Sequence, residues 1–429
     1  MTDPRTTTDY LYALRNRGSQ YGIARMQRFV AALGDPQLKF PVIHIAGTNG
    51  KGSVCAMLEA LYRNNGYKTG LFTSPHLVHL GERVQVDRQP LSMDEIAHYT
   101  RRLRAVAEDL ERESPGSHPT FFEFMAAMAF LHFAESGIDI AVIETGLGGR
   151  LDATNVVDPE LCIITSISLD HTDLLGETLP EIAREKAGIL KLGKPVLIGR
   201  LPEDAELVMG ETATRLGCPL HALDQCFSSS ADLPKTNLFG AFQRINAGLA
   251  LQATEILSQH FPIQSTSALQ QVDWPGRWQT LQVSGRRVIL DATHNPEGAT
   301  QLAESLASLK EKPIIITGTL GEERGRSLMQ AIIPFAQELH FVEPNQPRAV
   351  SSAFLRSCLP SDAPLPVHAK QLDALFSENE CFLGQPGDTI VCTGSIYLIG
   401  EILQLLQGVS STSASNLQDK MSPAQTKLP

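Results

Sequence analysis

A buried strand that runs directly into a glycine-rich loop constrains the fold of this chain more than any other segment. Residues 42–46 (VIHIA) lead without a gap into residues 47–53 (GTNGKGS), and an amphipathic helix follows. Glycines let backbone N–H groups converge, a helix N-terminus favours anions, and a lysine neutralises negative charge. The segment therefore predicts a phosphate-binding site for a nucleotide, built from the loop residues Gly47, Thr48, Asn49, Gly50, Lys51, Gly52 and Ser53.

The spacing of this loop departs from the common phosphate-binding form, in which Ser or Thr directly follows the lysine. Here Gly52 stands between Lys51 and Ser53, and Gly47 is only three residues before Gly50. A flexible glycine turn with a solvated lysine is the alternative interpretation. The strand on one side and the helix on the other favour the phosphate loop.

Short apolar runs alternate with helical patterns along most of the chain, which predicts βαβ units and parallel sheets. The runs form two series, at residues 42–46, 69–72, 138–143, 161–167 and 195–198, and then at 288–290, 313–317, 338–342 and 389–392. A strong turn signal at residues 273–277 (DWPGR) separates them. We expect an α/β protein in three parts. They are a P-loop nucleotide-binding domain that contains a mainly parallel sheet (1–272), a smaller Rossmann-like α/β domain (273–408) and a disordered tail (409–429).

Length and composition exclude several classes of protein. The 429 residues favour two domains, and the net charge of −11 argues against a protein that neutralises nucleic-acid phosphates. Seven cysteines without a Cys-x-x-Cys pair favour a reducing cytosol. The N-terminus has no secretory pattern, and residues 121–133, the nearest candidate for a membrane span, are too short and predict a buried helix. We therefore expect a cytoplasmic protein with neither a nucleic-acid nor a membrane partner.

Polar residues suited to metal–phosphate chemistry follow three of the predicted strands. Ser74, Glu144 and His171 each come at or just after a strand, and ligands of open parallel sheets gather at the carboxyl ends of the strands. Magnesium prefers hard oxygen ligands, so this rim predicts a magnesium site. A capping or surface role for Glu144 and a structural role for His171 remain open. Lys186 lies in a mixed charge run within the predicted helix 179–190, which is typical of a solvated face.

Several motifs resemble, in order and over nearly the whole chain, the folylpolyglutamate synthase and dihydrofolate synthase family of the Mur ligase superfamily. They are residues 47–53 (GTNGKGS), 74–77 (SPHL), 82–84 (ERV), 120–123 (TFFE), 146–155 (GLGGRLDATN), 170–172 (DHT), 185–189 (EKAGI), 275–277 (PGR), 291–296 (DATHNP) and 394–395 (GS). The resemblance implies a ligase that uses ATP to join L-glutamate to the carboxylate of a pteroyl or folyl substrate through an acyl phosphate.

The same resemblance implies roles for individual residues. Two magnesium ions are expected, one bound by Ser74 and Glu144 and the second by His171 beside Lys186, which looks like the family's carboxylated lysine. This implied role replaces the surface interpretation of Lys186. The remaining implied roles are ATP binding by Lys51 and its loop with Asn246, Arg277 and Asp291, catalysis by Lys51, Lys186 and His294, and binding of the pterin side by Tyr21, Gly22, Thr120, Phe122, Asp152 and Ala153. For His294, a plain turn role remains open.

Two positions depart from the family pattern, and several functional alternatives remain open. Phe242 stands where many relatives have histidine, and Thr293 stands where alanine is usual, which puts fine nucleotide contacts in doubt. Residues 149–152 (GRLD) resemble the bifunctional bacterial enzymes, so both dihydropteroate and tetrahydrofolate or its glutamates are expected substrates, with tail extension alone as the alternative. A peptidoglycan Mur ligase is disfavoured because only 46 residues precede Gly47. A non-catalytic ATP switch is a further alternative, and a monomer that closes about a hinge near Asp273 is expected.

Overall fold

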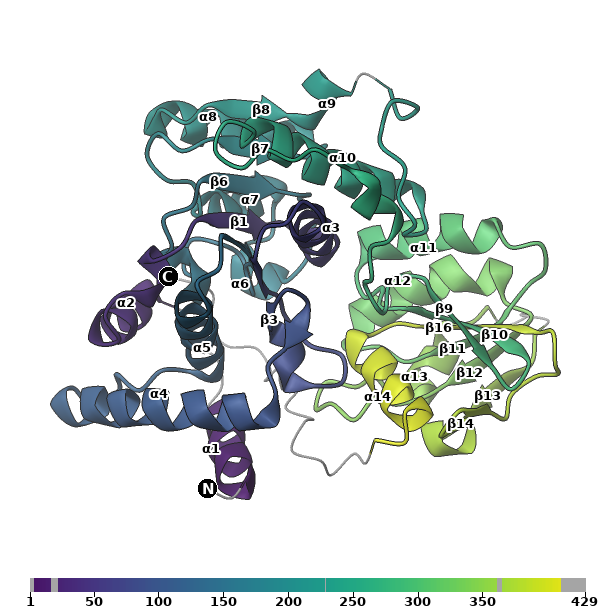
Figure 1. Ribbon diagram of the computed structural model, residues 1–429. Helices are drawn as coiled ribbons and strands as arrows, with labels where there is room; N and C mark the ends of the chain where they lie inside the picture. The colour runs from purple at the N-terminus through teal and green to yellow at the C-terminus, as the bar shows by residue number, and fades with distance from the viewer. Residues whose placement is uncertain (1–3, 17–21, 228, 361–364, 410–429) are drawn as a thin grey trace.

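Two mainly parallel β-sheets, each covered by helices on both faces, organise the chain (Figure 1). The computed structural model describes residues 4–16, 22–227, 229–360 and 365–409. Strands of the first sheet come from residues 42–222, and strands of the second come from residues 279–393. The predicted α/β class, with a larger sheet followed by a smaller one, is confirmed. The tail that we expected to be disordered lies, from residue 410 on, outside the described residues.

The first sheet has eight strands in the order β4-β3-β2-β5-β1-β6-β7-β8. All neighbours pair in parallel except β2 with β3 and β3 with β4, which pair antiparallel. Its strands are β1 (Val42–Ala46), β2 (Thr69–Phe72), β3 (Val84–Val86), β4 (Gln89–Pro90), β5 (Ile140–Glu144), β6 (Leu161–Ile164), β7 (Val196–Ile198) and β8 (Leu220–Ala222). The strand that precedes the glycine-rich loop, β1, therefore lies inside the sheet, between β5 and β6.

Helices cover this sheet on both faces, as near-continuous apolar strands require. Alternate residues of β1 enter different cores: Ile43 and Ile45 pack with α3 and α10, whereas Val42 packs with α1, α2, α4 and α5. Helices α7 and α8 pack over β6 and β7. The helices are α1 (Pro4–Asn16), α2 (Ile23–Ala32), α3 (Lys51–Asn64), α4 (Met93–Glu113), α5 (Phe121–Ser136), α6 (Thr172–Leu175), α7 (Leu179–Ala187), α8 (Glu203–Leu216), α9 (Leu223–Cys226) and α10 (Ala241–Ile256).

Three strands of the first sheet differ from their predicted bounds, β7 by a single residue at its start and β5 and β6 by more. Strand β6 ends at Ile164 instead of residue 167, because Thr165 and Ser166 turn to bond the glycine-rich loop. Strand β5 begins at Ile140 instead of residue 138, and the Asp139 carboxylate before it accepts a bond from the Lys68 backbone N–H at 2.7 Å. The predicted buried helix at residues 121–133 is confirmed as α5.

The second sheet has six strands in the order β13-β12-β11-β16-β10-β9, parallel except for the pair β9 and β10. Helix α14 packs on one face, and α11, α12 and α13 pack on the other. The elements are β9 (Gln279–Val283), β10 (Arg286–Asp291), α11 (Pro296–Ala307), β11 (Ile314–Thr317), α12 (Glu322–Ile332), β12 (Glu338–Phe341), α13 (Ser352–Ser357), β13 (Val367–Ala369), β16 (Thr389–Thr393) and α14 (Ile396–Leu406).

Short elements complete the fold. A small antiparallel pair joins β14 (Phe376–Ser377) to β15 (Glu380–Cys381). The 3₁₀ helices are η1 (Pro36–Leu38), η2 (Leu80–Arg83), η3 (Ala153–Val156), η4 (Ser267–Gln270), η5 (Ile333–Phe335) and η6 (Leu372–Ala374). Asp273 lies between η4, which packs on α3, and β9, the first strand of the second sheet. The exact domain boundary there stays a prediction.

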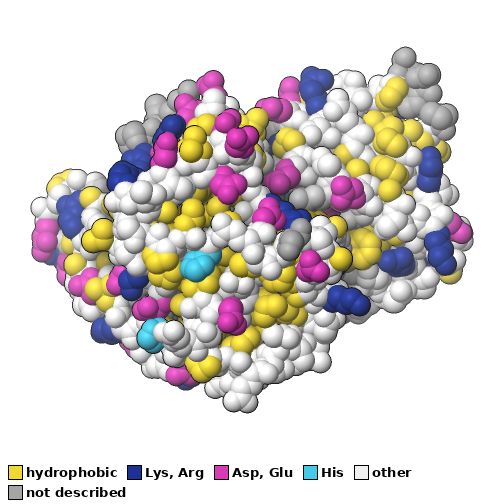
Figure 2. Space-filling view, turned by 90° about the horizontal axis from the view of Figure 1, so that it is seen from above, with side chains coloured by type: hydrophobic (Ala, Val, Ile, Leu, Met, Phe, Trp, Pro, Cys, Tyr) yellow, Lys and Arg dark blue, Asp and Glu magenta, His cyan; other side chains and the backbone are white. Residues whose placement is uncertain are grey.

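The described surface carries charges of both signs. On the face in Figure 2, Lys and Arg side chains are scattered among Asp and Glu side chains instead of forming one broad basic area. This pattern agrees with the net charge of −11. No helix in the described part of the chain is both long enough and apolar enough to cross a membrane.

Candidate active site

A cavity of about 470 Å³ lies where the carboxyl ends of strands from both sheets meet. Its walls come from the segments after β1, β2, β5 and β6 in the first sheet and after β10 and β16 in the second. Ligands of open α/β sheets bind at such edges. Of the residues predicted for the site, the cavity is lined by Gly22, Gly47, Thr48, Asn49, Gly50, Lys51, Gly52, Ser53, Ser74, Thr120, Phe122, Glu144, Asp152, Ala153, His171, Lys186, Asn246, Arg277, Asp291 and His294. Tyr21 lies outside the described residues.

The glycine-rich loop is held in shape by the segment that follows the neighbouring strand β6. Thr165 Oγ1 donates to the Asn49 carbonyl at 2.6 Å, and Ser166 Oγ accepts from the Asn49 N–H at 2.9 Å. Gly50 has φ +86°, and a Cβ there would lie 2.5 Å from Asn246 Oδ1. Glycine is therefore required where the loop enters α3. The close contact between Gly50 and Asn246 holds the N-terminus of α3 at the cavity wall. A helix N-terminus in that position is suited to bind phosphate.

Lys51 lies back over its own loop. Its Nζ donates to the carbonyls of Gly47 at 3.0 Å and Thr48 at 3.2 Å. These two bonds hold the ammonium group against the backbone of the loop that precedes α3. The alternative interpretation, a solvated lysine, is therefore wrong, because Lys51 Nζ is bonded to the loop backbone.

Ser74 and Glu144 lie side by side at the ends of two adjacent parallel strands. Glu144 is the last residue of β5, Ser74 follows β2, and the Ser74 N–H donates to Glu144 Oε2 at 3.2 Å. The Glu144 side chain is buried, so its alternative as a surface acid is wrong. Burial raises the pKa of Glu144, and the charge of Lys51 opposes that shift. A hydroxyl and a carboxylate at one wall are the hard oxygen donors that magnesium prefers.

His171 is the N-cap residue of the short helix α6 and has a left-handed conformation, with φ +51°. Burial lowers the pKa of His171 to about 4, although the neighbouring Asp170 carboxylate opposes the shift. The imidazole is therefore neutral at pH 7, and a neutral ring nitrogen can bind a metal ion.

Lys186 is buried, and the expectation of a solvated helix face is wrong for this residue. It lies near the end of α7 with an exposed fraction of 3%. Its Nζ donates to the Gly47 carbonyl at 2.8 Å, on the same oxygen that Lys51 contacts. Burial lowers the pKa of Lys186 to about 7, and the positive charge of Lys51 acts in the same direction. A large share of this amine is therefore uncharged at neutral pH.

Side chains from the second domain bond directly to the first. Asn295, the N-cap of α11, donates from Nδ2 to Asn49 Oδ1 at 2.9 Å and to Asp170 Oδ2 at 3.2 Å. Arg324 of α12 forms an ion pair with Asp170. Burial alone would raise the pKa of Asp170, but His171, which is protonated in the acidic range, and Arg324 outweigh burial and hold that pKa well below its usual range. Asp170 therefore stays charged at the junction of the two domains.

Asp291 and His294 mark the carboxyl end of β10. Asp291 accepts bonds from the N–H groups of Trp278 and Thr293, each at 3.1 Å, and so orders the turn. His294 Nδ1 lies 2.9 Å from the Ala292 carbonyl, which assigns the proton to Nδ1 and leaves Nε2 as an acceptor in the neutral ring. Burial lowers the pKa of His294, so the ring is neutral at pH 7. Arg277 also lines the cavity.

Two of the residues expected on the pterin side, Thr120 and Asp152, have clear local roles. Thr120 caps α5, and its Oγ1 donates to Glu123 Oε2 at 2.9 Å. Asp152 accepts bonds from the N–H groups of Leu147 and Thr154, each at 2.9 Å, and burial raises its pKa. These bonds shape the cavity wall, and contact of Asp152 with substrate stays a prediction.

Asn246 connects the loop to α10. Its Nδ2 donates to Gln243 Oε1 at 3.0 Å, and Gln243 Nε2 donates to Ser53 Oγ at 3.2 Å. Phe242, one of the two departures from the family pattern, also lines the cavity. The first turn of α3 is therefore braced by a chain of amide groups from α10.

Comparison with known proteins identifies the family. Residues 45–213 match the Mur ligase middle domain, and residues 276–396 match the "Mur ligase, glutamate ligase domain". The chain is 34% identical over 418 residues to the dihydrofolate synthase/folylpolyglutamate synthase of Bacillus subtilis, which covers 91% of this chain and 96% of the relative. This chain belongs to the folylpolyglutamate synthase and dihydrofolate synthase family. It is therefore a ligase of the Mur ligase superfamily.

Solved structures of this family share the fold. The folylpolyglutamate synthase of Mycobacterium tuberculosis complexed with ADP superimposes with a TM-score of 0.82 at 28% identity, covering 94% of this chain and 99% of that one. The E. coli FolC structure in complex with DHPP and ADP gives a TM-score of 0.78 at 26% identity, covering 94% of this chain and 98% of that one. The two-sheet arrangement is thus the fold of this ligase family.

Several residues of this ligase cavity carried no predicted role. Asp170 and Asn295 stood within recognised motifs, but only the three-dimensional contact between domains explains them. Trp274 lies within the turn signal, and a Cβ on Gly52 would come 2.7 Å from its ring. Arg324 carries no sequence signal beyond its charge.

Proposed function

We propose that this chain is an ATP-dependent ligase that joins L-glutamate to the carboxylate of dihydropteroate and to folyl glutamates. The single observation that carries the proposal is the cavity in which a phosphate loop, a magnesium-type rim and residues of the second domain come together. The similarity to a relative named for both activities supports two acceptor substrates.

A carboxylate does not react with an amine until its oxygen becomes a leaving group. Phosphoryl transfer from ATP converts that oxygen into phosphate, and the glutamate amine then displaces phosphate to form the amide. Such reactions depend on positioning and electrostatics. The loop N–H groups and Lys51 hold the polyphosphate, and Arg277 adds positive charge from the other domain.

Two magnesium ions fit the donors present. Ser74 and Glu144 would hold one ion, and His171 with a carboxylated Lys186 would hold the second. Magnesium bound there would neutralise phosphate charge during transfer. Carboxylation needs the neutral amine, because the nitrogen lone pair attacks CO₂ and a proton leaves. The pKa of Lys186, near 7, meets that requirement.

His294 would assist the second step. Its Nε2 is an acceptor in the neutral ring, so it can take the proton that the glutamate amine loses when the amide forms. Water must be excluded from the cavity, since it would hydrolyse an acyl phosphate. We propose that the chain acts as a monomer and closes further about the hinge near Asp273. Scattering curves that superimpose with and without ATP, magnesium and pteroate would count against the closure.

The activity is tested with purified protein, magnesium-ATP and glutamate, with dihydropteroate and tetrahydrofolate as separate acceptors. We expect glutamate-dependent phosphate release with both acceptors and products heavier by one glutamate. Lys51→Gln should abolish release, while Lys312→Gln, at an exposed lysine, should not. Release with tetrahydrofolate alone would restrict the function to tail extension. Nucleotide binding without release for any acceptor would indicate an ATP switch instead.

The role of Asp152 in accepting dihydropteroate needs a matched control, because its carboxylate also holds its own loop. Thr154 is buried, does not line the cavity, and belongs to the same hydrogen-bond network. We expect Asp152→Ala to lose dihydropteroate use selectively and Thr154→Val to retain it. Equal loss of dihydropteroate use in both variants would assign the effect to loop shape instead of substrate contact.

The Lys186→Ala enzyme should bind magnesium-ATP and turn over poorly. Bicarbonate should raise the rate of wild-type enzyme prepared without CO₂, and it should leave the variant unchanged. A wild-type rate in the variant would remove the proposal of a carboxylated lysine.

A further inference from the structure

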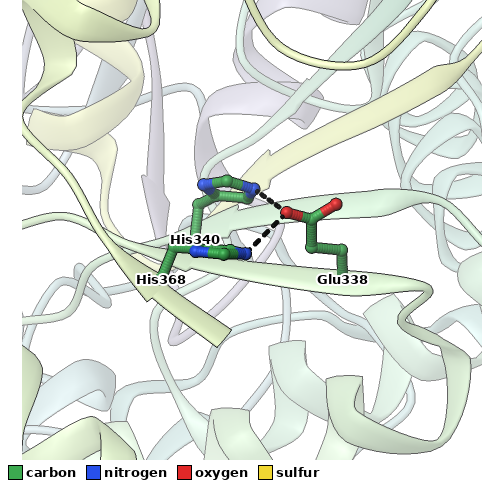
Figure 3. Close-up of side chains that lie close together, drawn as sticks. All are labelled: Glu338, His340 and His368. Carbon is green, nitrogen blue, oxygen red and sulfur yellow. Dashed lines mark hydrogen bonds and ion pairs between the residues drawn. The ribbon is translucent and has the colours of Figure 1, made fainter. Parts of the chain in front are cut away.

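Two histidines and a glutamate meet at the edge of the second sheet, away from the cavity. Glu338 and His340 belong to β12, and His368 belongs to β13, the edge strand (Figure 3). Glu338 Oε1 lies 2.8 Å from His340 Nε2 and 3.0 Å from His368 Nε2. None of the three lines the cavity described above.

The sheet register brings these side chains together. His340 and His368 are direct partners in the parallel pairing of β12 with β13. Glu338 is two residues from His340, so both side chains lie on one face of the strand, whereas Leu339 and Phe341 enter the core on the other face. The two imidazole rings stack with centroids 5.0 Å apart. The cluster is therefore set by the backbone of two paired strands.

Exposure differs across the cluster in a way that suits an exchangeable ligand. His340 is buried, the Glu338 side chain is 26% exposed, and the His368 side chain is 45% exposed. A small ion can thus reach the three donor atoms from solvent on the side of the edge strand.

The donor atoms lie close enough together for one metal ion to contact all three. One ligand atom from each of the three residues lies within 4.8 Å of the other two. With metal–ligand bonds of about 2.1 Å, neighbouring ligand atoms lie roughly 3.0 Å apart at right angles and roughly 3.4 Å apart at the tetrahedral angle. The two distances to Glu338 Oε1 are close to the first value. Two imidazoles with one carboxylate favour zinc, nickel, cobalt or copper over magnesium or calcium.

We propose that Glu338, His340 and His368 form a binding site for a divalent transition-metal cation, separate from the ligase cavity. The ion binds Nε2 of both histidines and a carboxylate oxygen of Glu338, and it cross-links the edge strand β13 to β12. Water completes its coordination on the exposed side. The site is independent of the proposed ligase reaction.

The surroundings of His340 set the expected strength of binding. Within the described part of the chain, His340 Nδ1 is buried without a hydrogen-bond partner. Metal-binding histidines usually donate from the second nitrogen, and loss of such a partner weakens binding by roughly 10- to 100-fold. We therefore expect an ion that a chelator removes easily.

The experiment titrates chelator-treated full-length protein with Zn²⁺ in a calorimeter, with excess magnesium and ADP present to occupy the ligase cavity. His368→Gln and Glu338→Gln are the test variants, and His260→Gln, at an exposed histidine elsewhere, is the control. We expect wild type and control to bind one more zinc equivalent than the two test variants. Co²⁺ should give a visible absorption band for imidazole coordination in wild type that both test variants lose.

Ligase activity without added zinc separates this site from the proposed function. We expect all four proteins to give the same rate with magnesium-ATP, because the cluster does not touch the cavity. Equal zinc binding in all four proteins would overturn the site. Absence of zinc binding in wild type would also overturn it and would leave a hydrogen-bonded group that only joins two strands.

Discussion

Replacement of Lys186 by methionine should stabilise the protein at neutral pH while it removes ligase activity. Methionine has a similar length and no charge. The pKa of the lysine falls from 10.5 to about 7 because its amine is buried, with Lys51 acting in the same direction. At about 1.4 kcal/mol for each pH unit, a protonated amine at this position costs the folded protein roughly 5 kcal/mol relative to the unfolded chain.

The variant also loses one interaction. The bond from Nζ to the Gly47 carbonyl at 2.8 Å disappears, and an unsatisfied buried acceptor costs roughly 1–3 kcal/mol. Subtracting the cost of this lost bond from the penalty for the buried charge leaves Lys186→Met more stable than wild type by roughly 2–4 kcal/mol at pH 7 and below.

The sign of the stability difference between variant and wild type depends on pH. The unfolded chain keeps the proton on this lysine up to about pH 10.5, and the folded chain keeps it only up to about pH 7. The penalty in wild type is therefore complete below pH 7, shrinks between pH 7 and 10.5, and vanishes above that range. Near pH 10.5 only the lost hydrogen bond remains, so the variant should become the less stable protein.

Urea unfolding at pH 6, 7.5 and 10.5 in CO₂-depleted buffer measures these differences, with Lys312→Met as the control at an exposed lysine. The control should match wild type at every pH. A Lys186→Met protein that is less stable than wild type at pH 6 would refute the reasoning. So would a gain in stability that is the same at all three pH values.

Three other changes test separate parts of the cavity. Gly50→Ala should raise the nucleotide Kd by about tenfold or more, because its φ of +86° and a Cβ 2.5 Å from Asn246 Oδ1 distort the loop, and calorimetry with ADP checks this. Glu144→Gln should raise the magnesium concentration for half-maximal rate by about tenfold or more, and an unchanged magnesium profile would contradict its role as a ligand. Arg324→Met leaves the buried Asp170 charge without its ion pair, at a cost of roughly 3–5 kcal/mol, so hydrogen exchange in α11 and α12 should accelerate.

Strands and the phosphate loop were predictable because their signals are local. An apolar run marks a strand that is buried on both faces, and the GTNGKGS segment carries its own turn and helix start. The antiparallel edge strand β9 was missed because its exposed side chains break the apolar pattern. Strand β13, with three residues and two of them exposed, gave no such run either.

Lys186 shows where local pattern fails. A Glu-Lys pair on a helix is typical of a solvated face, and nothing within nine residues of helix reveals that the end of α7 lies under the phosphate loop. Only the order of strands in the sheet places Gly47 above this lysine. The resemblance to a family supplied the position, and the tertiary structure supplies the physical reason for its low pKa.

Asp152 shows a different limit of prediction from sequence. The motif identifies the residue but does not reveal which hydrogen bonds its carboxylate accepts. An ionised carboxylate offers about four acceptor positions. The Thr154 hydroxyl takes one at 2.5 Å, and the N–H groups of Leu147 and Thr154 take two more. His44, buried within β1, in turn bonds the Thr154 hydroxyl at 2.8 Å. The backbone N–H of Gly146 acts on the same carboxylate, so the loop itself occupies most of the acceptor positions of Asp152. Asp152→Ala therefore also removes bonds that hold the loop, and this is why Thr154→Val, which removes only the bonds of the Thr154 hydroxyl, is the control for Asp152→Ala.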